Sequence, residues 1–95
     1  MNQIKTILAD DHKLFCEGLE RVLAESGLFQ VIAKFHNGQS LLENLQHHSP
    51  DLLIIDVEMP LLNGFDAIKR VRIKNPSLKI VVLSMHEQSV FSHQP

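Results

Sequence analysis

The 95-residue sequence has no tryptophan, no tyrosine and a single cysteine, which excludes an intramolecular disulfide and favours a reducing compartment, the cytoplasm. No apolar run approaches the length of a membrane span, and the N-terminus lacks a signal-peptide core, so we expect no membrane contact. The net charge of −2 lacks the basic excess of nucleic-acid-binding surfaces, so we expect no direct nucleic-acid binding. Length and a hydrophobic fraction of 44% indicate one globular domain over residues 1–95.

Short apolar runs alternate with segments in which apolar residues recur at helical spacing. Asp11 is a candidate N-cap for the first helix, and Cys16 falls in its apolar pattern, which indicates core packing. A fourth helix is expected to begin at Glu87. The predicted strands are Ile4–Ala9, Phe29–Phe35, Leu52–Ile55 and Leu78–Leu83, and the predicted helices are His12–Ser26, Leu41–Leu45 and Phe65–Lys74.

This alternation predicts an α/β fold with a parallel sheet and helices on both faces. The strand runs are continuously apolar, as expected for parallel strands that are buried on both sides. Right-handed crossovers then favour a doubly wound sheet, with strand order 2-1-3-4 if the second unit winds opposite to the later ones.

In that order the carboxyl ends of strands one, three and four are neighbours, and each carries polar residues. Asp10 and Asp11 follow the first strand, Asp56 the third and Ser84 the fourth. Crowded carboxylates disfavour each other's ionisation, and a hard divalent cation such as Mg²⁺ would offset this. Asp56 could then act as a nucleophile toward phosphorus, or it could only cap the following turn.

The whole set resembles a bacterial response-regulator receiver domain. The resemblance rests on the Asp10-Asp11 pair, on Asp56 followed by Met59-Pro60 and Asn63-Gly64, and on Ser84. The segments Ala9-Asp10-Asp11-His12 and Leu83-Ser84-Met85-His86 are most similar to those of the branch with a helix-turn-helix output domain.

The resemblance implies a flavodoxin-like fold and a signalling domain whose only chemistry is self-phosphotransfer. Asp56 would accept a phosphoryl group from a histidine kinase to control a transcriptional output domain absent from this sequence. Asp11 and Asp56 would bind Mg²⁺ directly, Asp10 through water and Glu58 through its backbone carbonyl. Ser84 would hydrogen-bond the phosphoryl group, while the Glu58 side chain and Met85 would flank the site.

The sequence also departs from this family, because it stops before the family's fifth strand, its lysine and its fifth helix. Two alternatives therefore stay open: a phosphoacceptor that switches poorly, or a non-phosphorylated interaction or dimerisation module that has lost the switch. We expect a homodimer through the exposed edge of the fourth strand and the residues after Ser84.

Other functions receive less support from the sequence. His47-His48 has no zinc-ligand spacing, and no glycine-rich nucleotide loop follows the first strand. An aspartate-nucleophile phosphatase would have Asp-x-Asp on strand one, whereas this sequence has Asp10-Asp11.

Overall fold

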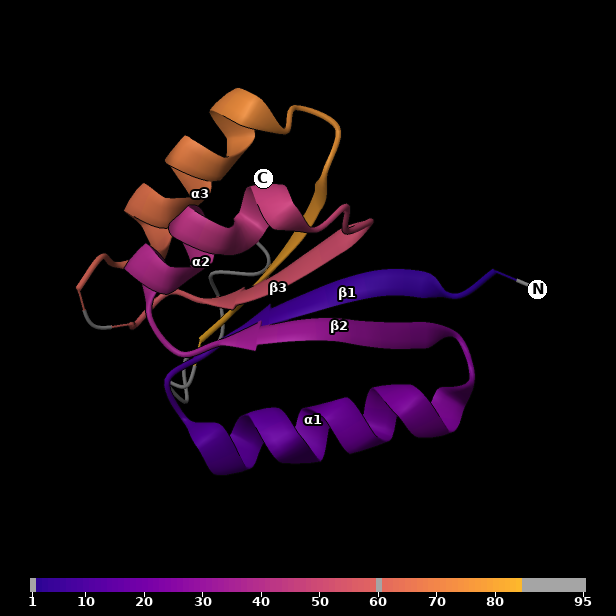
Figure 1. The fold of residues 1–95 in the computed structure, drawn as a ribbon. Coiled ribbons are helices and arrows are strands. Elements are labelled where there is room, and N and C mark those ends of the chain that lie inside the picture. The colour runs from indigo at the N-terminus through magenta and orange to yellow at the C-terminus, as the bar shows by residue number, and fades with distance from the viewer. Residues whose placement is uncertain (1, 60, 85–95) are drawn as a thin grey trace.

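The fold is a four-stranded parallel sheet, seen in a computed structural model that describes residues 2–59 and 61–84 (Figure 1). The strand order is β2-β1-β3-β4 and every pairing is parallel, which confirms the predicted topology. The elements in chain order are β1 (Ile4–Ala9), α1 (Lys13–Ser26), β2 (Phe29–Phe35), α2 (Gly38–Asn44), the 3₁₀ helix η1 (Leu45–His47), β3 (Leu52–Asp56), α3 (Gly64–Lys74) and β4 (Lys79–Leu83).

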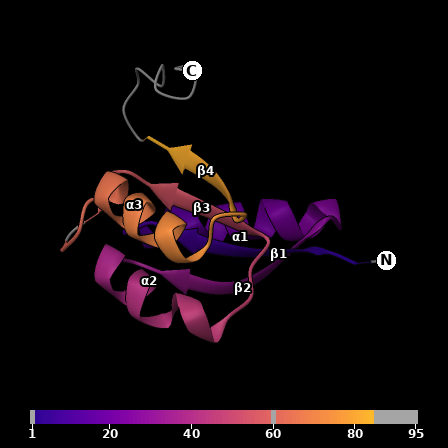
Figure 2. The same cartoon turned by 90° about the horizontal axis from the view of Figure 1, so that it is seen from above.

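Helices cover both faces of this sheet, as the alternation predicted. Helix α1 lies on one face, and α2 and α3 lie side by side on the other (Figures 1 and 2). Within the described ranges, no helix has the length and apolar character needed to cross a membrane.

The two central strands carry the core. Residues Ile7–Ala9 of β1 and Leu53–Ile55 of β3 are buried, so apolar side chains point into both layers. Cys16 packs with Leu8 and Ile54 under α1, which confirms its predicted core position. Burial raises the pKa of its thiol to about 11, so the thiolate that reacts with oxidants and metals is scarce at neutral pH.

Of three local predictions, one is corrected, one is confirmed and one falls outside the described residues. His12, not Asp11, occupies the N-cap of α1, because its backbone is extended and the helix begins at Lys13. Strand β4 confirms the exposed edge expected of the fourth strand: Val81 is 46% exposed, and β4 is paired only with β3 in the described part of the chain. The helix expected from Glu87 lies outside the described residues.

The turn from β3 into α3 brings two backbone segments into direct contact at Gly64. Its N–H donates to the carbonyl of Val57 at 2.9 Å, and the Asn63 side chain caps the helix by accepting from the N–H of Asp66. A Cβ atom on Gly64 would lie 2.4 Å from the Val57 Cα and 2.6 Å from the Asp56 carbonyl oxygen. Only glycine allows α3 to start this close to the end of β3.

We expect Gly64→Ala to destabilise the fold by about 1–3 kcal/mol, because the contacted atoms are backbone and cannot move independently. Gly18→Ala is the matched control: Gly18 is exposed within α1, and a Cβ added there would meet no atom within 4 Å outside the adjoining helix backbone. This change should stabilise by about 0.5–1 kcal/mol through helix propensity. Urea unfolding measures both, and equal stabilities of Gly64→Ala and wild type would contradict the close approach.

Candidate functional site

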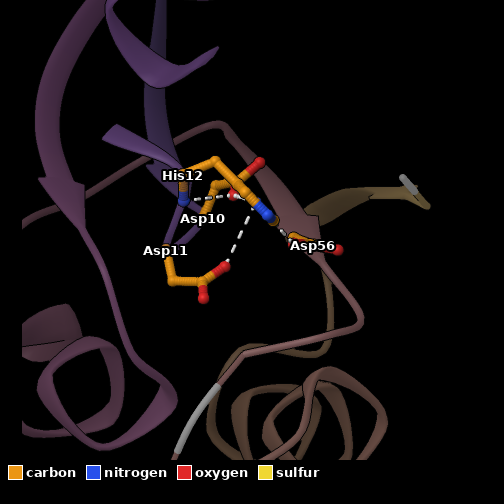
Figure 3. Close-up of side chains that lie close together, drawn as sticks. All are labelled: Asp10, Asp11, His12 and Asp56. Carbon is orange, nitrogen blue, oxygen red and sulfur yellow. Dashed lines mark hydrogen bonds and ion pairs between the residues drawn. The ribbon is translucent and has the colours of Figure 1, made fainter. Parts of the chain in front are cut away.

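The carboxyl edge of the sheet gathers four ionisable side chains. Asp10, Asp11 and His12 follow β1, and Asp56 is the last residue of β3 (Figure 3). One potential metal-ligand atom from each residue lies within 4.8 Å of all the others. The predicted convergence of Asp10, Asp11 and Asp56 is therefore present in the structure, because β1 and β3 are hydrogen-bonded neighbours.

Asp56 is fully buried, yet among the described residues only one of its carboxylate oxygens has a hydrogen-bond partner. Oδ1 accepts from the backbone N–H of Glu58 at 3.1 Å. Oδ2 has no hydrogen-bond partner among the described residues. Desolvation by burial raises the pKa of Asp56, and the neighbouring charges of Asp10 and Asp11 act in the same direction. Asp56 is thus a buried carboxylate that its surroundings only partly stabilise.

Asp10 is held by its backbone as well as by its side chain. Its N–H donates to the carbonyl of Phe35, and its own carbonyl accepts from His36 Nδ1 at 2.8 Å and from the Cys16 thiol at 3.6 Å. The side chain is buried: Oδ1 accepts from the His12 backbone N–H, whereas Oδ2 has no partner in the described ranges. Contacts from β2 and α1 therefore fix Asp10 at the edge.

His12 belongs to this cluster, which the sequence reasoning missed. Its Nδ1 lies 2.8 Å from Asp10 Oδ1, 3.2 Å from Asp11 Oδ1 and 3.7 Å from Asp56 Oδ2. The hydrogen bond to Asp10 raises the pKa of the imidazole above its ordinary value, and the carboxylates around it add to this effect. Its position directly after the acidic pair was the available signal, but only the chain direction at the N-cap decides where the ring points.

Ser84 and Glu58, the other predicted site residues, lie at the same edge. Ser84 follows Leu83, which is the register partner of Asp56 across the β3–β4 pair. Glu58 is exposed, two residues beyond Asp56, and its N–H holds the Asp56 carboxylate. Met85, predicted to flank the site, lies outside the described residues.

The donor set fits a hard divalent cation. Mg²⁺ prefers carboxylate oxygens and water, and the two buried oxygens without hydrogen bonds in the described ranges, Asp10 Oδ2 and Asp56 Oδ2, are acceptors that a cation would satisfy. Asp11 is 35% exposed, which leaves an open side from which water and a further ligand can approach.

Curated proteins of known role have sequences similar to this one. DegU from Brevibacillus brevis is 34% identical over 90 residues, which are 95% of this chain and 38% of that protein. GacA from Pseudomonas syringae is 31% identical over 88 residues, 93% of this chain and 41% of that protein. The chain therefore spans about two fifths of the length of these curated relatives.

Solved structures agree with the sequence matches. The receiver domain of NarL from Mycobacterium tuberculosis superposes with a TM-score of 0.86 at 28% identity, covering 98% of this chain and 75% of that one. RcsB from Salmonella typhimurium gives 0.83 at 32% identity, over 90% of this chain and 44% of that one. The family model described as the response regulator receiver domain matches residues 6–94. The chain belongs to the response regulator receiver domain family.

Proposed function

We propose that this domain takes a phosphoryl group from a histidine kinase onto Asp56, with Mg²⁺ at the adjacent carboxylates, and so controls a transcriptional output domain. The observation that carries the proposal is the state of Asp56: fully buried, with one oxygen unbonded within the described part of the chain, at the edge that it shares with Asp10 and Asp11. A free-thiol protein of this kind is expected in the cytoplasm, where Cys16 stays reduced.

The chemistry is a nucleophilic displacement at phosphorus. A carboxylate oxygen of Asp56 forms a bond to phosphorus as the bond from phosphorus to the kinase histidine nitrogen breaks, and that nitrogen keeps the electron pair. The hydrogen bond from the Glu58 N–H to Oδ1 orients the carboxylate. Ser84 follows Leu83, the register partner of Asp56, and its hydroxyl would donate a hydrogen bond to the transferred phosphoryl group.

A cation at this edge removes the electrostatic obstacle to this reaction. Asp10, Asp11 and Asp56, with the Glu58 backbone carbonyl, would hold Mg²⁺, which neutralises both the carboxylates and the incoming phosphoryl oxygens. Asp11, the most exposed of the three carboxylates, can coordinate the ion directly, and Asp10 can act through a bound water.

The relatives support this assignment. The isolated receiver domain of RcsB was solved in the presence of the phosphomimetic BeF₃⁻, and RcsB was also solved bound to promoter DNA. DegU and NarL are named as transcriptional regulatory proteins. By analogy, we propose a transcriptional output and a histidine kinase as partners of this domain. We also propose a homodimer through β4, whose outer edge has no strand partner among the described residues.

Phosphorylation is tested by intact mass after incubation with Mg²⁺ and acetyl phosphate. We expect wild type to gain one phosphoryl group, which hydroxylamine removes because an acyl phosphate is labile to it. Asp56→Asn should gain none, and Glu25→Gln, an exposed site on α1, should behave as wild type. Modification of Asp56→Asn would contradict the acceptor assignment. Failure of wild type to react, with Mg²⁺ binding intact, would favour the non-phosphorylated interaction module.

Metal binding is tested by thermal and urea unfolding with and without Mg²⁺. At ten times its dissociation constant, a ligand that binds only the folded state stabilises by about 1.4 kcal/mol. We expect this gain in wild type and Glu25→Gln and its loss in Asp11→Ala, because Asp11 is expected to be a direct ligand. An equal Mg²⁺ gain in Asp11→Ala would contradict that role.

The buried charge predicts a pH-dependent effect of Asp56→Asn in the presence of a chelator. The folded state raises the Asp56 pKa above 3.8, so its ionisation opposes folding at neutral pH and stops doing so as pH falls through the raised pKa toward 3.8. Asp56→Asn should therefore stabilise at pH 7 by about 1–2 kcal/mol, the scale of an unsatisfied buried polar group. The gain should shrink at lower pH.

Asp11→Asn is the matched control for this comparison. It removes one carboxylate from the same cluster, but its side chain is 35% exposed and keeps most of its hydration. Its effect on the free energy of unfolding should be smaller than that of Asp56→Asn. A larger effect of Asp11→Asn would show that repulsion between the carboxylates, rather than burial, dominates.

A further inference from the structure

The His12 imidazole stands among the three carboxylates rather than beside them (Figure 3). A single ring nitrogen, Nδ1, lies 2.8 to 3.7 Å from one oxygen each of Asp10, Asp11 and Asp56. The His12 backbone N–H also donates to Asp10 Oδ1 at 2.8 Å, so the residue is tied to the cluster by its main chain. The backbone of His12 is therefore fixed at the cluster, while its ring is held by the hydrogen bond from Nδ1 to Asp10 Oδ1.

In the structure Nδ1 is hydrogen-bonded to Asp10 Oδ1, and the same separations fit ligands around one ion that takes the place of the bonding proton. Donor atoms about 2.1 Å from a metal lie about 3.0 Å apart at right angles and about 3.4 Å apart in a tetrahedron. The nitrogen–oxygen distances of 2.8, 3.2 and 3.7 Å span this range. An independent observation points to a ligand here: the buried oxygens Asp10 Oδ2 and Asp56 Oδ2 have no hydrogen-bond partner in the described residues.

A nitrogen in this set changes which metals the site accepts. Mg²⁺ takes oxygen ligands, so an imidazole adds nothing to its affinity. Imidazole is a good ligand for first-row dications such as cobalt, nickel and zinc; the affinity of such sites rises from manganese to copper and falls at zinc. His12 is 49% exposed, so its ring can turn out to solvent when an all-oxygen coordination is preferred.

We propose that His12 is a nitrogen ligand of a d-block dication, such as Co²⁺ or Zn²⁺, at the same carboxylates that we assign to Mg²⁺. The inference rests on the proposed function only because it takes Asp10, Asp11 and Asp56 as the metal-binding carboxylates. His12 is then the residue that sets metal specificity: it strengthens the binding of borderline metals and contributes nothing to Mg²⁺ binding.

The test compares Co²⁺, Zn²⁺ and Mg²⁺ binding to the full chain by titration calorimetry, with the visible absorption of Co²⁺ as a direct report of its ligands. The variants are His12→Ala and His12→Asn; asparagine is favourable at an N-cap and keeps the helix start while it removes the imidazole. His47→Ala is the control for metal bound by an exposed histidine elsewhere. Asp11→Ala reports whether both metal classes use the same carboxylates.

We expect both His12 variants to lose at least about tenfold in Co²⁺ and Zn²⁺ affinity. Mutating a residue that only hydrogen-bonds a metal ligand already costs about tenfold or more, and losing a ligand should cost no less. Their Mg²⁺ affinity should stay within about threefold of wild type, and the Co²⁺ absorption band should weaken and shift. His47→Ala should match wild type, and Asp11→Ala should weaken every metal.

Two results would overturn the inference while leaving the Mg²⁺ site in place. The first is that Co²⁺ affinity and Co²⁺ absorption are the same in the His12 variants as in wild type. The absence of any Co²⁺ binding to wild type would count as this result too. The other is an equal loss of Mg²⁺ and Co²⁺ affinity, which would mean that His12 only supports the carboxylates. Absent Mg²⁺ binding in wild type, with normal Co²⁺ binding that depends on His12, would instead overturn the Mg²⁺ assignment.

Discussion

The burial of Asp10 and Asp56 beside a third carboxylate, Asp11, is the constraint on which the site depends. Asp56 is fully buried and Asp10 is 3% exposed, so neither carboxylate can rely on water to stabilise its charge. The surrounding protein offers one backbone N–H to Asp56 and the His12 N–H to Asp10, which leaves two buried oxygens without hydrogen bonds within the described ranges. A cation that binds among these carboxylates therefore stabilises the folded state.

The sheet holds the cluster together despite the cost of burying these charges. Strands β1 and β3 are adjacent over four register pairs that end at Ala9 and Ile55, so the residues that follow meet at one edge. The backbone of Asp10 is anchored to Phe35 and His36 at the end of β2 and to Cys16 on α1. The buried strands thus supply the free energy that the carboxylates cost.

The turn after β3 is under a comparable steric constraint. Gly64 lies against the backbone of Asp56 and Val57, and Gly38, at the start of α2, lies against the backbone of Leu62. Leu61 adopts a left-handed conformation with φ of 73°, which a non-glycine residue tolerates only when the surrounding structure enforces it. The described residues of this turn therefore leave no room for larger side chains at Gly38 and Gly64, where α2 and α3 begin.

The sequence by itself determined the strands, their order and the convergence of Asp10, Asp11 and Asp56, because continuous apolar runs, helical periodicity and right-handed crossovers depend on short-range patterns and chain direction. Periodicity also placed Cys16 in the core. Neither periodicity nor strand order predicted the N-cap of α1 or the entry of His12 into the cluster. Those features depend on which backbone groups remain unpaired and where a side chain points once neighbouring strands are in place, and only the tertiary structure decides that.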